Sequence, residues 1–101
     1  MIPEIKDLAD EYVSYIRLEK NYSSYTVAEY EKDLREFLAF LHEEHINVLD
    51  DVEYPVARLY VTRLYDRSFA RTTISRKISS IRSFFKFTNA RYGIQDQAFQ
   101  L

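Results

Sequence analysis

The sequence predicts an all-α, compact four-helix domain, and a short fifth helix is left open at its C-terminal end. The chain has 101 residues, which is the length of one domain with a single core. One glycine and two prolines are too few for the many tight turns of an all-β protein. Four segments repeat apolar residues at steps of three and four, and this spacing places them on one face of a helix.

The first two helices are expected over about residues 3–20 and 24–44. Ile5, Leu8 and Tyr12 share one face of the first helix. The Asn-Tyr-Ser-Ser segment between the helices interrupts the pattern with residues that cap helices. The apolar stripe of the second helix consists of Val27, Tyr30, Leu34, Phe37, Leu38 and Leu41.

A third helix is expected over about residues 53–67, after a connection over residues 46–51 in which Asp50 or Asp51 can cap it. Pro55 is tolerated because it falls in the first turn, where its missing N–H is not needed. The residues that this helix is expected to bury are Val56, Leu59, Tyr60 and Leu64.

The fourth helix is expected over about residues 71–92, with a core face and a polar face. Ala70 stands where a capping side chain is common, so Ser68 and Thr72 are alternative caps, and Gly93 suits the left-handed residue that ends a helix. The core face consists of Ile74, Ile78, Ile81, Phe85 and Thr88. The opposite face consists of Thr72, Arg76, Ser79, Ser80, Ser83 and Phe87, flanked by Arg82, Lys86 and Lys77.

Sixteen of the residues are aromatic, and most of them fall on the core stripes of these helices. Core packing is therefore their expected role. Four lie off the stripes or at their edges, and we expect these to dock a partner or another domain: Tyr25, Phe40, Phe84 and Phe87.

Positive charge is concentrated in one quarter of the chain. The net charge is -2, but residues 67–91 hold seven basic residues and no acidic one, whereas residues 1–66 hold seven basic and fifteen acidic ones. Serine and threonine are poor helix formers, so helix propensity does not explain their number on the polar face of the fourth helix. Short hydroxyl side chains let a helix approach the major groove, while Arg and Lys reach phosphates or guanine edges. The pattern favours double-stranded DNA as the partner over a merely solvated face.

Several classes of site are disfavoured by composition. Without cysteine there is no disulfide or thiolate metal site, and neither a glycine-rich phosphate loop nor a catalytic set can be assembled. His42 and His45 are not in the i, i+4 arrangement of zinc helices and lack a third ligand, so a solvated helix end is favoured over a metal site. The apolar runs are too short to span a membrane, and the N-terminus lacks a signal core. We therefore expect a cytoplasmic binding module without a cofactor.

Two sequence motifs carry a resemblance to a known family. The first covers residues 18–27 (LEKNYSSYTV) and is followed by Tyr30, Asp33-Leu34 and Phe37. The second covers residues 71–87 (RTTISRKISSIRSFFKF). The first resembles the opening helices and the second the fourth helix of the Xer-type tyrosine recombinases, most closely the XerC-like branch and next other phage-integrase relatives. The order and separation of the two motifs also match, so the resemblance spans nearly the whole chain.

The resemblance implies a SAM-like core-binding domain over residues 1–93 that clamps one side of a DNA duplex with its second and fourth helices. Residues 94–101 would begin the linker to a C-terminal catalytic domain, so this fragment would not itself be an enzyme. The parent protein would cut and rejoin DNA in chromosome dimer resolution, and thus in chromosome partition and cell division, or in integration, with a second recombinase subunit in a tetramer on DNA. The contact positions that the resemblance implies are Tyr25, Lys32, Arg71, Thr72, Arg76, Ser79, Ser80, Ser83 and Lys86.

The sequence departs from the family pattern in its second helix and its tail. Ala28 and Glu31 stand where many relatives carry basic residues, with Glu29 nearby, and this weakens the electrostatic argument for that helix. Asp96-Gln97 stands where relatives often have Asn-Pro before the linker. The alternative function, from another class, is a SAM-like protein-interaction module whose basic helix meets an acidic partner protein.

Overall fold

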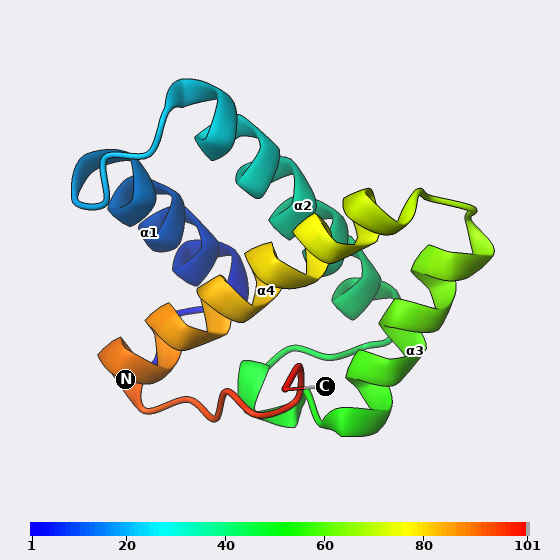
Figure 1. Ribbon diagram of the computed structural model, residues 1–101. Coiled ribbons are helices and arrows are strands. Elements are labelled where there is room, and N and C mark those ends of the chain that lie inside the picture. Colours follow the sequence, from blue (N-terminus) through cyan, green and yellow to red (C-terminus); the bar gives the residue numbers. More distant parts are fainter. Residues whose placement is uncertain (101) are drawn as a thin grey trace.

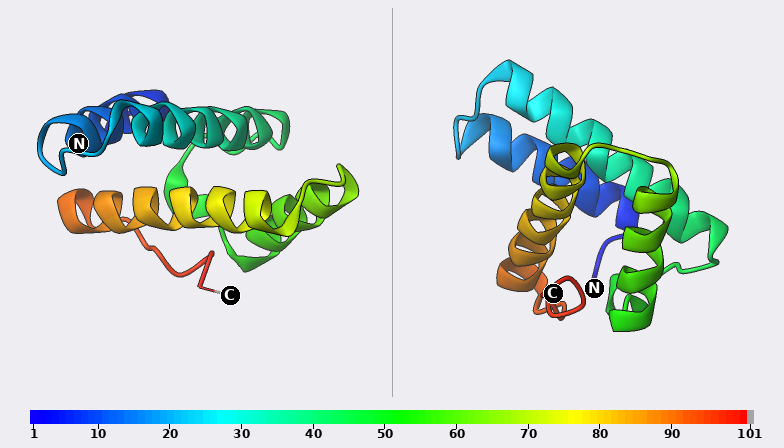
Figure 2. Two further views of the ribbon diagram at one scale, coloured as in Figure 1. Left: turned by 45° about the horizontal axis from the view of Figure 1, so that its top comes forward. Right: turned by 45° about the vertical axis from the view of Figure 1, so that its right-hand side comes forward.

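A hairpin of two helices forms one layer of the molecule. In the computed structural model, which describes residues 1–100, α1 spans Ile5–Leu18 and α2 spans Ser24–Glu43. The hydroxyl of Ser23 caps α2 by accepting a hydrogen bond from the backbone N–H of Thr26 at 3.2 Å. The two helices lie side by side and run in opposite directions (Figures 1 and 2).

The second layer is built around α4, which spans Arg71–Tyr92 and crosses the hairpin (Figure 1). A short 3₁₀ helix, η1 (Leu49–Asp51), leads into α3 (Tyr54–Asp66), which packs beside α4. The helix α4 contacts α1, α2 and α3, so it is the central element of the domain. The radius of gyration of 12.9 Å agrees with the roughly 13 Å of a compact chain of this length.

The predicted all-α, four-helix fold class is confirmed, and most helix ends follow local signals. The bounds predicted for α4 are those observed, and Gly93 ends it in the left-handed conformation with φ 71°. Neither Ser68 nor Thr72 caps α4; its N-cap residue is Ala70, which makes no side-chain hydrogen bond. Glu53 is the N-cap of α3, and the two aspartates expected to cap that helix belong to η1 instead.

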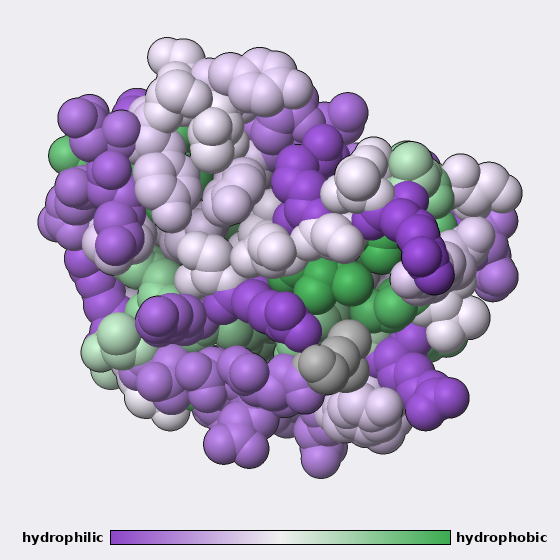
Figure 3. Space-filling model, viewed as in Figure 1, coloured by the Kyte–Doolittle hydropathy of each residue, from purple (hydrophilic) through white to green (hydrophobic). Residues whose placement is uncertain are grey.

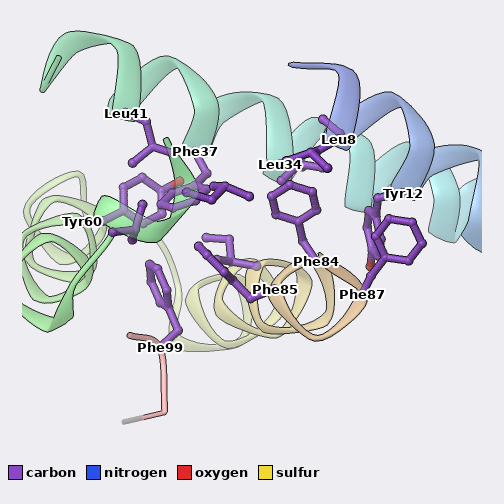
Figure 4. Packing of buried hydrophobic residues seen from close by; sticks show 14 of the residues in the cluster. Leu8, Tyr12, Leu34, Phe37, Leu41, Tyr60, Phe84, Phe85, Phe87 and Phe99 are labelled. Carbon is purple, nitrogen blue, oxygen red and sulfur yellow. The ribbon is translucent and has the colours of Figure 1, made fainter. Parts of the chain in front are cut away.

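Aromatic side chains fill the space between the two layers (Figure 4). The ring of Phe37 is surrounded by those of Tyr60, Phe85 and Phe99, with centroid separations of 5.1, 6.2 and 5.4 Å. Edge-to-face pairs of this kind add roughly 0.5–1.5 kcal/mol each to the burial of their area. The core therefore joins α2, α3, α4 and the C-terminal segment in one cluster.

The prediction that three aromatic residues lie at exposed edges is wrong. Phe84 and Phe87 are buried because α4 is covered on several sides and its buried surface is wider than a single stripe. Phe40 of α2 is buried against α3, where its ring centroid lies 4.9 Å from that of Tyr60. In α3, the expected burial of Leu59 is not observed, because its side chain is 39% exposed; Ala57 is buried on this helix.

The segment after Gly93 packs against the domain. Within residues 94–100 no helix follows, so the fifth helix left open by the sequence is not formed there. Three side chains of this segment, Ile94, Ala98 and Phe99, are buried. The carbonyl of Phe99 accepts a hydrogen bond from Arg82 Nε at 2.7 Å. The expected linker start at residues 94–101 is thus packed on the core as far as the structure describes it, and Leu101 lies outside the described residues.

No helix in residues 1–100 combines the length and apolar character needed to span a membrane.

Candidate nucleic-acid interface

One side of α4 presents a stripe of hydroxyl and basic side chains. Thr72, Ser79 and Lys86 are exposed and follow one another at seven-residue steps, which keeps them on one line of the helix, and Arg71 is exposed at its start. Figure 3, which views the molecule with α4 in front, shows near-neutral polar side chains across the middle of this face, among strongly hydrophilic ones. Ser83 lies on the same side and is half-buried. We call Arg71, Thr72, Ser79, Ser83 and Lys86 the α4 stripe.

A buried carboxylate on α2 anchors the N-terminal half of α4. Asp33 is completely buried and accepts two hydrogen bonds from the guanidinium of Arg76, from Nε to Oδ2 and from Nη2 to Oδ1, both at 3.0 Å. The ammonium of Lys77 donates to Asp33 Oδ1 at 3.1 Å and to Glu36 Oε2 at 2.8 Å. The hydroxyl of Ser80 donates to Asp33 Oδ2 at 3.0 Å. With Glu29, whose Oε2 lies 3.2 Å from Arg76 Nη1, these residues form the Asp33 cluster: Glu29, Asp33, Glu36, Arg76, Lys77 and Ser80.

The charges of the Asp33 cluster compensate one another inside the protein. Burial by itself raises the pKa of Asp33, but the hydrogen bonds from Arg76, Lys77 and Ser80 outweigh it, so this pKa lies below its ordinary value. The hydrogen bond to Asp33 in turn raises the pKa of Arg76. Two cations face three carboxylates, so the cluster carries a formal charge of about -1 and adds no positive potential to the surface.

This geometry changes the role of two expected contact positions. Ser80 is fully buried and cannot reach a ligand, which corrects the expectation that it lies on an exposed face. Arg76 directs Nε, Nη1 and Nη2 at carboxylates, and these are the donors that a bidentate contact with guanine needs. Lys77, expected beside the polar face, is also buried. The physical reason is that α2 covers this side of α4. Arg76, Lys77 and Ser80 therefore bind Asp33 and hold α4 on α2.

Ser83 is positioned by the core beneath it. The phenol of Tyr12 donates to Ser83 Oγ at 2.8 Å. Burial raises the pKa of Tyr12, so its phenol stays protonated and remains a donor. Because the serine oxygen is used as the acceptor, its own hydrogen can be directed at an acceptor outside the protein.

The expected positions on α2 lie at the surface. Tyr25 is 74% exposed in the first turn, and Lys32 is exposed two turns later. The two glutamates that weakened the electrostatic argument for this helix are both paired within the protein. Glu29 contacts Arg76, and Glu31 Oε2 lies 3.3 Å from Arg35 Nη2. Their charge therefore opposes an approaching polyanion less than the sequence suggests.

Only part of the basic segment is left to face a partner. Arg76 and Lys77 are held by carboxylates of α2. Among the described residues, Arg67, Arg71 and Lys86 are exposed and take part in none of the ion pairs, and the guanidinium of Arg67 lies 4.8 Å from the centroid of Phe69. The positive charge available at the surface is thus smaller than the +7 of residues 67–91.

The sequence that forms the four helices matches a known family. Residues 9–91, from the middle of α1 to the end of α4, match the phage integrase N-terminal SAM-like domain. The chain belongs to this family.

Curated relatives of this phage integrase SAM-like domain are tyrosine recombinases. The chain is 38% identical over 97 residues to "Tyrosine recombinase XerC" of Bacillus subtilis (strain 168). The aligned segment covers 96% of this chain and 32% of the relative. It is 45% identical over 87 residues to "Tyrosine recombinase XerC" of Listeria monocytogenes serovar 1/2a, and this aligned segment covers 86% of this chain and 29% of the relative. The chain therefore spans about a third of the length of these relatives. No solved structure matches it.

The residues of this SAM-like domain that sequence reasoning missed are the acidic partners of the basic helix. Asp33 lies on the same helical face of α2 as Tyr30 and Phe37, two residues of its apolar stripe. An aspartate among core positions needs hydrogen-bonding or charged partners, because an unpaired buried charge is costly. That signal identifies a buried ion pair, but not which cation completes it.

No group of three or more His, Cys, Asp or Glu side chains within residues 1–100 is placed to hold a metal ion.

Proposed function

We propose that this chain is the duplex-binding N-terminal domain of a site-specific tyrosine recombinase, and that the α4 stripe faces the DNA. The observation that carries the proposal is the coincidence of two features. The chain belongs to the phage integrase SAM-like family, and the hydroxylated face of α4 also carries two exposed cations, Arg71 and Lys86, that join no ion pair among the described residues.

Each part of the surface has a distinct task in this proposal. Arg71 and Lys86 neutralise phosphates, while Thr72 and Ser79 are short enough to let the helix backbone approach the groove. Tyr25 and Lys32 extend the contact along α2. The Asp33 cluster holds α4 rigidly on α2, so that little ordering entropy is lost on binding.

The parent protein would carry further functions outside this chain. The relatives are about three times as long, so strand cleavage and rejoining would belong to a catalytic domain in the remaining part. That domain would close on the other side of the duplex, and a second recombinase subunit would complete an assembly on DNA. Because this domain covers one side only, we expect its own affinity to be weak, with a Kd of about 10⁻⁴–10⁻⁶ M for random duplex.

The proposal is tested by salt-dependent binding to a random-sequence DNA duplex, followed by fluorescence anisotropy. Each of Arg71→Gln and Lys86→Gln should reduce the slope of log affinity against log salt by about one unit. The matched control is Lys6→Gln, which removes an exposed lysine from the first turn of α1, beside a groove formed with the end of α2. It should leave the slope unchanged.

Two results would overturn the proposal. One is the absence of duplex binding at low salt; the other is equal behaviour of all three variants. If polyglutamate binds as tightly as the duplex and competes with it, an acidic partner protein becomes the better explanation of the basic helix.

A further inference from the structure

A groove between the end of α1 and the C-terminal half of α4 is lined by cations. It has a volume of about 460 Å³, and Lys20, Lys86 and Arg91 lie along it together with Tyr22 and Ser83. None of the described residues that line this α1–α4 groove is acidic. Four other surface grooves are each lined by at least one carboxylate, namely Glu4, Asp10, Asp50 and Glu36 respectively.

Aromatic rings line the α1–α4 groove and orient one of its cations. The rings of Tyr15 and Phe87 lie 4.8 Å apart, and the guanidinium of Arg91 lies 4.9 Å above the centroid of Phe87. A guanidinium held over an aromatic ring still has N–H donors available for a planar or tetrahedral anion. The competing contact, between Arg91 Nη2 and Glu19 Oε2, is 4.0 Å long and solvent-exposed, so it is weak and easily exchanged.

The groove also contains a hydroxyl set up to donate. Ser83 Oγ accepts the hydrogen bond from Tyr12, and its own hydrogen can therefore point into the groove. Phosphodiester oxygens are acceptors, so they complement a serine donor as well as the three cations. Ser83 and Lys86 belong to the α4 stripe too, and the groove is thus continuous with the proposed interface.

We propose that the α1–α4 groove seats a phosphodiester group of the DNA backbone, held by Lys20 and Arg91 together with Lys86. The proposal rests on the proposed function and extends it, because it brings the end of α1 into contact with the duplex. Three positive charges line this groove on a protein whose net charge is -2, and the weak contact of Arg91 with Glu19 offsets one of them only in part, so the groove attracts an anion.

The test is the salt dependence of binding to random-sequence duplex by the double variant Lys20→Gln/Arg91→Gln. We expect the slope to fall in magnitude by about one to two units relative to wild type, while Lys6→Gln leaves it unchanged. Arg91→Lys keeps the charge and should retain the wild-type slope. Amide NMR shifts of the wild-type protein give a second measurement: titration with the duplex should move the signals of Lys20, Tyr22 and Arg91.

The outcomes separate this inference from the proposed function. If Arg71→Gln reduces the slope but the double variant behaves like Lys6→Gln, and the groove amides do not shift, the groove proposal is wrong and the interface on α4 stands. If wild type binds no duplex at all, both proposals fail. A double variant that does not fold leaves the wild-type NMR titration to decide.

Discussion

Removing the charge of Asp33 should destabilise the domain more than any surface charge change. In Asp33→Asn the buried carboxylate becomes an amide of similar size, whose NH₂ group faces the donors of Arg76 and Lys77. Breaking a buried ion pair by removing one partner costs about 3–5 kcal/mol. For a domain of this size that loss lowers the thermal midpoint by roughly 12–40 °C. The measurement is thermal and urea unfolding followed by far-ultraviolet circular dichroism.

The control for this prediction is a carboxylate in an exposed ion pair. Asp10 Oδ1 lies 2.7 Å from Arg35 Nη2, but the two side chains are 65% and 41% exposed. Asp10→Asn should therefore cost less than about 1 kcal/mol. Equal thermal and urea midpoints for Asp33→Asn and Asp10→Asn would refute the idea that the Asp33 cluster holds α4 on α2.

The same pair of proteins tests the electrostatic origin of the effect. The pKa of folded Asp33 is lowered, so its carboxylate stabilises the fold above its ordinary pKa of 3.8 and loses this effect as pH falls through the lower folded value. The stability difference between wild type and Asp33→Asn should be constant near neutrality and shrink below about pH 5. A difference that stays constant down to pH 2 would point to lost packing instead.

Two further predictions concern the C-terminal end. Phe99→Ala should cost about 3–5 kcal/mol in urea unfolding, because the ring is buried against Phe37 and Phe85; an unchanged midpoint would mean that the segment after Gly93 is not docked. Gly93→Ala should cost about 1–2 kcal/mol from its φ of 71° alone, since no atom lies within 4 Å of an added Cβ. Gly93→Asn should cost less, and equal losses for the two variants would contradict a purely backbone origin.

The helices could be predicted because their signals are local. Ser23 and Gly93 act within one turn of the residues that they cap, and apolar spacing needs no knowledge of the rest of the fold. The burial of α4 could not be predicted in the same way. A helix pattern identifies faces, but the number of neighbours that cover a helix depends on tertiary packing. Phe84 and Phe87 are buried for this reason, although they lie away from the predicted stripe.

The candidate site was predicted less completely than the fold, and the reason is electrostatic. A count of charges along the chain treats Arg76 like Arg71, because both belong to the same acid-free segment. Only the structure shows that α2 supplies the carboxylate of Asp33 to Arg76, whereas Arg71 joins no ion pair within residues 1–100. The exposed members of the predicted set stay predictions, whereas Ser80 is removed from it by burial.

The pairing of charges between α2 and α4 has an effect on both helices. Glu29 and Asp33 neutralise cations that would otherwise face outward, which lowers the positive potential of α4. The same contacts occupy two carboxylates on the helix expected to lie beside DNA, and Arg35 occupies a third, Glu31. An acidic α2 can then approach a polyanion at little electrostatic cost. The attraction is supplied by a few exposed cations at defined positions. Affinity should consequently depend on individual residues such as Arg71 and Lys86 more than on the total charge of the segment.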